Sequence, residues 1–119
     1  MARDAALITT WSTPARGREA KALEVFMELM GFWGRQAAAG KCEEPQVFFA
    51  TDGSHGVFVV KGRSDALMEI QESDEGQELF AKGHMIVQDL KSHWYFTGDT
   101  EVQRGTQILV QAGTALGFM

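Results

Sequence analysis

The side chains best suited to chemistry in this 119-residue chain are its three histidines, His55, His84 and His93. A neutral imidazole can act as a general base or bind a metal near neutral pH. The histidines lie 29 and 9 residues apart and form no His-x-His or His-x-x-x-His pair, so we expect no metal site. His55 falls in a glycine-rich loop and His84 near a helix end, which leaves His93 as the candidate functional group.

His93 belongs to the aromatic stretch SHWYFTG, residues 92–98. If this stretch is a strand, alternation places His93 and Tyr95 on one face and Trp94 and Phe96 on the other. His93 is therefore our candidate catalytic base, or a group that orients a ligand carbonyl or carboxylate. The alternative is a histidine satisfied by a backbone or cross-strand partner at a subunit interface, and the rule that buried polar groups find partners favours it.

Trp11, Trp33 and Trp94 belong to the first predicted strand, the first predicted helix and the last predicted strand. We expect these three elements to lie next to one another in the fold. Wide aromatic rings and adaptable methionines often line apolar ligand cavities. The same residues could equally fill an ordinary hydrophobic core. The predicted ligand-binding residues are Trp11, Met30, Trp33, Phe49, His93, Trp94 and Tyr95.

The remaining reactive groups favour no further site. Cys42 is the single cysteine, and the carboxylates of Glu43 and Glu44 beside it oppose a reactive thiolate. The acidic run over residues 69–78 is typical of a solvated helix face. There is no glycine-rich phosphate loop, so nucleotide binding has no support and we expect no cofactor.

The composition limits the partners and the compartment. Sixteen acidic and eleven basic residues give a net charge of -5, which disfavours nucleic acid and anionic membranes. No segment approaches the roughly 18 to 20 apolar residues of a membrane span. One cysteine allows no intrachain disulfide, and no signal peptide is visible at the start, so we expect a cytoplasmic protein.

The elements that must position these residues follow from periodicity and turn chemistry. Residues 5–12 read as a strand and residues 18–39 as a helix. Residues 46–51 and 57–61 read as two strands, and the turn residues 52–56 join them into a β-hairpin. The predicted apolar stripe of the first helix consists of Leu23, Phe26, Met27, Met30, Trp33 and Ala37.

The pattern of the second half of the sequence predicts a helical region followed by a strand. Ser64 and Asp65 offer N-cap chemistry to a helical region that Gly76 interrupts, so one or two helices are expected before residue 83. Residues 89–97 form the last predicted strand. Residues 99–119 are a C-terminal extension in which helix and strand patterns are nearly balanced.

The order β-α-β-β-α-β predicts one α+β domain over residues 1–119, with a ferredoxin-like antiparallel sheet and helices on one of its faces. The strands are apolar on both faces, although a half-exposed strand should alternate. Exposing such a face would cost several kcal/mol at roughly 25 cal/mol per Å2 of apolar surface. A two-fold partner is the simplest cover, so we expect a homodimer through the sheet faces.

With these strands, ALITTWS, QVFFAT, GVFVVKG and HWYFTG, the chain apart from its extension resembles the dimeric α+β barrel superfamily. This superfamily includes antibiotic-biosynthesis monooxygenase-like proteins and many members of unknown function. No catalytic motif carries the resemblance. It therefore implies a ferredoxin-like subunit that pairs sheet against sheet, and it implies no activity.

Our functional hypothesis is a small homodimer that binds an apolar or amphipathic organic molecule, fatty-acid-like or aromatic, between the sheet and the helices. One alternative is a cofactor-independent monooxygenase of the antibiotic-biosynthesis type, which needs a base, a donor to a carbonyl and a dry cavity. The other is a non-catalytic structural or regulatory dimer with a filled core.

Overall fold

The computed structural model describes residues 2–119, which form four strands and four helices. The element order agrees with the predicted β-α-β-β-α-β pattern, with the second helical region divided in two and a helix added at the end. The elements are β1 (Asp4–Trp11), α1 (Glu19–Ala38), β2 (Gln46–Phe49), β3 (Gly56–Arg63), α2 (Ser64–Glu72), α3 (Asp74–Ile86), β4 (Lys91–Phe96) and α4 (Asp99–Ala115).

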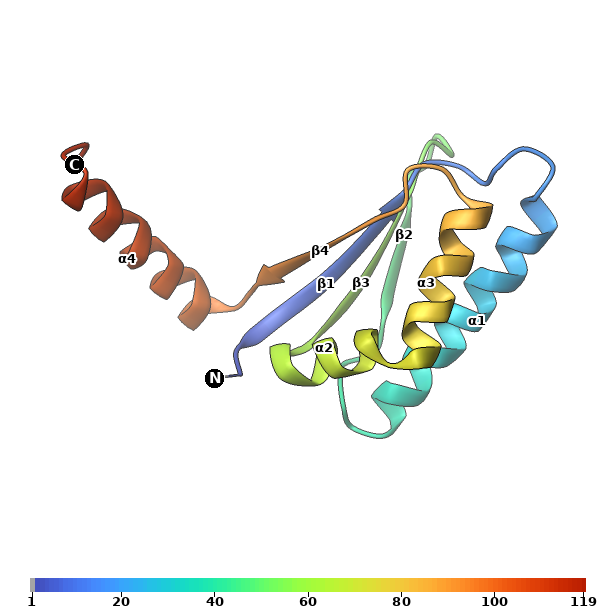
Figure 1. Ribbon diagram of the computed structural model, residues 1–119, viewed down its shortest axis with the longest axis horizontal. Coiled ribbons are helices and arrows are strands. Elements are labelled where there is room, and N and C mark those ends of the chain that lie inside the picture. The colour runs from blue at the N-terminus through green and yellow to red at the C-terminus, as the bar shows by residue number, and fades with distance from the viewer. Residues whose placement is uncertain (1) are drawn as a thin grey trace.

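The four strands form one antiparallel sheet in the order β2-β3-β1-β4. Figure 1 shows α1, α2 and α3 on one side of this sheet. This is the ferredoxin-like α+β arrangement that the element order predicts. No helix within residues 2–119 is both long and apolar enough to cross a membrane.

The hydrophobic core lies between the sheet and the three helices that cover it. Leu7 of β1 is paired with Val60 of β3, and residues paired across strands share a face. Val60 and Leu67 are both 0% exposed, and Phe58 is 1% exposed. The first helix differs from the predicted stripe, because Leu23 and Met27 are 64% and 62% exposed. Its buried residues are Ala22, Phe32 and Trp33.

The break between α2 and α3 lies at Ser73, three residues before the glycine that the sequence suggested. The Ser73 hydroxyl accepts a hydrogen bond from the Gly76 N–H at 3.1 Å and so caps α3. A Cβ at Gly76 would lie 2.6 Å from the Ile70 carbonyl oxygen. Glycine at this position therefore lets the first turn of α3 pack directly on the end of α2.

The C-terminal extension is a helix, α4, which settles the balance between helix and strand. In Figure 1, α4 projects beyond the end of β4, on the side of the sheet away from α1, α2 and α3. Its residues include no buried one. The Arg3 guanidinium and the Glu101 carboxylate, 3.3 Å apart, join the first turn of α4 to the start of β1.

The second face of the sheet is left uncovered within residues 2–119. One row of paired residues crosses it from Val59 through Ile8 to His93. Phe48 and Tyr95 on the same face are 55% and 48% exposed. We call this surface the open face. It carries the two-sided strand pattern that led us to expect a partner.

Candidate functional site

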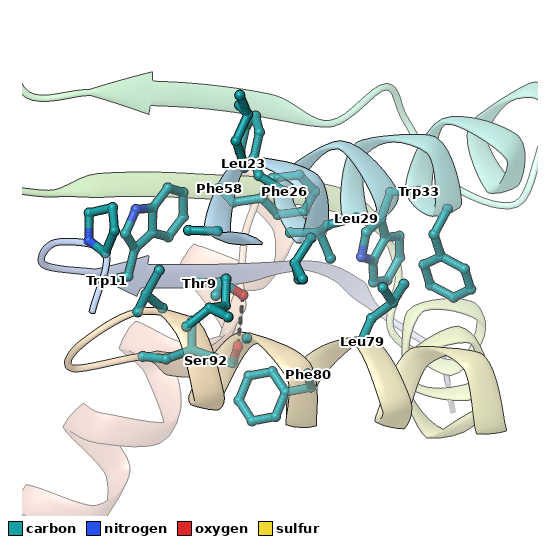
Figure 2. A pocket seen from close by; sticks show the side chains of 18 of the residues that line it. Thr9, Trp11, Leu23, Phe26, Leu29, Trp33, Phe58, Leu79, Phe80 and Ser92 are labelled. Atoms are coloured by element: carbon teal, nitrogen blue, oxygen red, sulfur yellow. Dashed lines mark hydrogen bonds between the residues drawn. The ribbon is translucent and has the colours of Figure 1, made fainter. Parts of the chain in front are cut away.

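An apolar pocket of about 350 Å3 lies between the helix-facing side of the sheet and the helices α1 and α3. Figure 2 shows side chains from both layers converging on it. Its volume is at the lower end of the range for small-molecule sites, about 300 to 1,000 Å3. The pocket is lined mainly by aliphatic and aromatic groups, among them Leu7, Trp11, Phe26, Leu29, Trp33, Phe58, Leu79 and Phe80.

One end of the pocket carries an aromatic trio, Trp11, Phe26 and Phe49, contributed by β1, α1 and β2. The ring centroids are 6.2 Å apart for Trp11 and Phe26, and 5.8 Å for Phe26 and Phe49. The third pair, Trp11 and Phe49, is at 6.4 Å with an interplanar angle of 77°. Tilted and edge-to-face rings at these distances attract one another. Phe49 is 66% exposed, so the trio reaches the protein surface.

The position of Trp11 depends on Gly56, its partner in the β1–β3 register. A Cβ built on Gly56 would lie 2.7 Å from the Cε2 atom of Trp11, which is closer than real Cβ contacts. The indole therefore lies across the bare backbone of Gly56. Gly56, which the sequence indicates as a turn residue, thus also supports a side chain of the pocket wall.

We expect Gly56→Ala to destabilise the protein by about 1 to 3 kcal/mol, because the new methyl group displaces a packed indole. Gly34→Ala is the matched control, since no atom lies within 4 Å of a Cβ at that helical position. The control should be neutral or more stable by up to about 1 kcal/mol. Urea unfolding of both variants measures the difference, and equal stabilities would contradict this packing.

The polar groups of the pocket are few. Thr9 and Ser92 lie side by side on its sheet side, with 2.7 Å between their hydroxyl oxygens (Figure 2). The other lining residues with polar side-chain groups are Gln71, Glu19 and the two indoles Trp11 and Trp33, and among the described residues Glu19 is the one ionisable group there. Hydrogen bonds from the backbone N–H groups of Glu19 itself and of Gly17 lower the pKa of the Glu19 carboxyl. A lower pKa makes this carboxylate a weaker base.

The structure divides the seven predicted ligand-binding residues into two groups. Trp11, Trp33 and Phe49 line the pocket. Met30 packs against the core but does not line the pocket. The three predicted residues of the last strand, His93, Trp94 and Tyr95, do not line it either.

The last strand differs from expectation for two physical reasons. His93 and Tyr95 point to the open face, because His93 is paired with Ile8 and Tyr95 with Ala6. Trp94 is on the helix-facing side beside Leu7, yet it is 39% exposed and lies on the edge strand. His93 therefore cannot serve as the base or polar anchor of a molecule held in this pocket.

Sequence reasoning missed Thr9 and Ser92. Each is a short polar residue two positions before a more conspicuous tryptophan, Trp11 in β1 and Trp94 in β4. Their common row becomes visible only when the β1–β4 register is known, because that register pairs Thr9 with Ser92. Alternation along each strand assigns the two residues to faces, but it does not show that the two strands are neighbours.

The other candidate groups are distributed over separate elements. Burial raises the pKa of the Cys42 thiol, and the Glu44 and Glu43 carboxylates add to this effect. Cys42 is therefore less ionised than an ordinary thiol near neutral pH. His84 packs edge-on against Phe80, with ring centroids 4.7 Å apart, while His55 contacts the Ser54 hydroxyl in the hairpin loop. Residues 2–119 contain no cluster of three groups able to hold a metal ion.

Comparison with known proteins gives similarity at the level of structure. No protein-family model and no curated protein matches the chain. Rv0793 from Mycobacterium tuberculosis is 16% identical, with a TM-score of 0.66 over 81% of this chain and 96% of that one. SnoaB, a cofactor-independent oxygenase from Streptomyces nogalater, is 11% identical, with a TM-score of 0.65 over 82% and 95%. PA3566 from Pseudomonas aeruginosa is 20% identical, with a TM-score of 0.59 over 81% and 95%. The property shared with these proteins is the fold.

Proposed function

We propose that this chain, which has the fold of the dimeric α+β barrel superfamily, binds an apolar organic molecule between its sheet and its helices. The observation that carries the proposal is the pocket of about 350 Å3, which reaches both Trp11 and Trp33. A filled structural core would leave no such space, because protein interiors are close-packed. The third hypothesis, a purely structural dimer, is therefore less well supported.

The pocket also has an entrance suited to an apolar molecule. Leu23 and Phe49 both line it and are 64% and 66% exposed. An apolar ligand that enters between α1 and β2 would cover these side chains. Burying apolar area stabilises a complex by roughly 25 cal/mol per Å2 before the costs of association.

We further propose that the active form is a homodimer in which a second copy covers the open face and α4. The open face exposes Phe48 and Tyr95, and α4 projects on the same side of the sheet (Figure 1). From residue 105 to residue 119 the chain carries no charged side chain. One two-fold partner would cover both surfaces, because a symmetric interface buries the same patch on each copy. The exposed apolar residues near and in α4 include Val102, Ile108, Leu109, Val110, Leu116, Phe118 and Met119.

Native mass spectrometry of the gently purified protein tests both proposals. We expect a species of twice the 13.1 kDa chain mass with additional small-molecule mass that is released on denaturation. The two-copy mass reports the dimer and the additional mass reports the ligand, so the two proposals are scored separately. A single chain without bound mass would contradict both.

The alternative function is a cofactor-independent monooxygenase, which the structural similarity to SnoaB favours. Such chemistry would need a base beside the substrate, and the one ionisable group in the described pocket lining is Glu19, whose pKa is lowered. The geometry therefore favours binding over catalysis. Oxygen consumption with a polyphenol or quinol distinguishes the two, because an oxygenase consumes oxygen in step with substrate and a binding protein does not.

A further inference from the structure

The Thr9 and Ser92 hydroxyls form a polar pair on the sheet side of a largely apolar pocket (Figure 2). Thr9 is 8% exposed and is the one buried polar residue of the described chain. Its Oγ1 lies 2.7 Å from the Ser92 Oγ across the β1–β4 pair. The row to which they belong continues through Phe58 to Val47, so the two hydroxyls lie at one end of an apolar floor.

The Thr9–Ser92 pair has one O–H hydrogen that the bond between the two hydroxyls does not use. Two hydroxyls carry two O–H hydrogens, and the bond between them uses one. Neither oxygen has a second side-chain or backbone partner within residues 2–119. The hydroxyl that accepts within the pair therefore keeps one hydrogen that can be donated into the pocket. A buried donor gains most when an acceptor meets it, because an unpaired donor in an apolar site costs free energy.

The charge of the lining limits what that acceptor can be. Within the described residues no lysine, arginine or histidine lines the pocket, and its one charged group is the Glu19 carboxylate. An anionic head group buried there would lose its hydration without gaining a cation. A neutral carbonyl oxygen needs only the one donor that the pair supplies.

We propose that the Thr9–Ser92 pair is the polar anchor of the pocket and selects neutral ligands that carry a carbonyl group on an apolar ring system. This inference rests on the proposed ligand-binding function and narrows it. Of the two ligand types expected from the sequence, it excludes a fatty-acid carboxylate held at this pair and retains a carbonyl-bearing aromatic molecule.

Three matched probes test the anchor. 1-Tetralone is a bicyclic ketone, tetralin has a methylene in place of its carbonyl, and 1,2,3,4-tetrahydro-1-naphthoate carries a carboxylate on the same rings. Affinities are measured by NMR titration of the wild-type protein and of the double variant Thr9→Val/Ser92→Ala. The double variant replaces both partners by apolar groups, which keeps the site satisfied and the fold intact. The single variants Thr9→Val and Ser92→Ala provide a second route if the double variant does not fold.

The measured quantity is the ratio of the tetralin Kd to the 1-tetralone Kd. We expect this ratio to fall by roughly three- to tenfold in the double variant, the value of one neutral hydrogen bond. The carboxylate should bind more weakly than the ketone to the wild-type protein. An unchanged ratio, or tighter binding of the carboxylate than of the ketone, would contradict the Thr9–Ser92 anchor but not the proposal that the pocket binds a ligand. If none of the probes binds the wild-type protein, the proposed binding function itself has failed.

Discussion

The Ala22→Phe variant is expected to keep its fold and to lose affinity for 1-tetralone by at least about tenfold, or about 1.4 kcal/mol. Ala22 is 7% exposed, lies on α1 and lines the pocket, so its Cβ is directed at the space between the helices and the sheet. A benzyl group there would occupy the volume that a ligand needs. Because the cavity is apolar, filling it adds contacts and need not destabilise the protein.

The matched control for this prediction is Ala20→Phe. Ala20 is on the same helix but is exposed and is not among the residues that line the pocket. Circular dichroism and thermal unfolding establish that both variants are folded, and the 1-tetralone titration then compares their affinities. If Ala22→Phe binds the ketone as well as Ala20→Phe does, the ligand lies somewhere other than this pocket.

The second large effect is expected at the open face, where Val59→Glu should convert the proposed homodimer into monomers. Val59 is half-buried in the single chain and is paired with Ile8 and Gln46 near the middle of this face. A symmetric interface would bury two uncompensated carboxylates, at a cost of several kcal/mol per ion. The dissociation constant should rise by at least about a hundredfold, which is roughly 3 kcal/mol.

Sedimentation velocity over a concentration series measures this change. Ala20→Glu introduces the same charge on an exposed position of α1, in the helical layer on the other side of the sheet, and should leave the dimer intact. A Val59→Glu protein that still sediments as a dimer would show that the two copies associate through another surface. A wild-type protein that is monomeric at all concentrations would contradict the dimer directly.

The fold was largely accessible from the sequence because local signals agreed with one another. The loop from Asp52 to Gly56 predicted the hairpin, and the pairing of β2 with β3 confirms it. The strands that are apolar on both faces predicted that a partner covers the second face, and within residues 2–119 no helix covers that face. The α4 segment was less accessible, because TQILVQ satisfies strand and helix patterns alike and α4 has no buried residue within the described part of the chain.

The candidate site could be predicted only in part, because the sequence does not show which strands are paired or which face of the sheet the helices cover. Trp11 and Trp33 were predicted ligand-binding residues and line the pocket, because large aromatic residues of β1 and α1 are directed toward the space between sheet and helices. His93 lies on the open face and does not line the pocket, a placement that alternation alone could not give because it separates two faces without telling which one the helices cover. Thr9 and Ser92 needed the pairing of the first and last strands, a contact between residues 83 positions apart.

The central claim is that the sheet–helix pocket binds a small apolar molecule, and the three indole N–H signals of the 15N-labelled protein test it most directly. Trp11 and Trp33 line the pocket, whereas Trp94 does not and serves as an internal control. On titration with 1-tetralone, we expect the Trp11 and Trp33 signals to shift and saturate together while the Trp94 signal stays in place. Unchanged Trp11 and Trp33 signals up to the solubility limit, or a shift of Trp94 alone, would contradict the account.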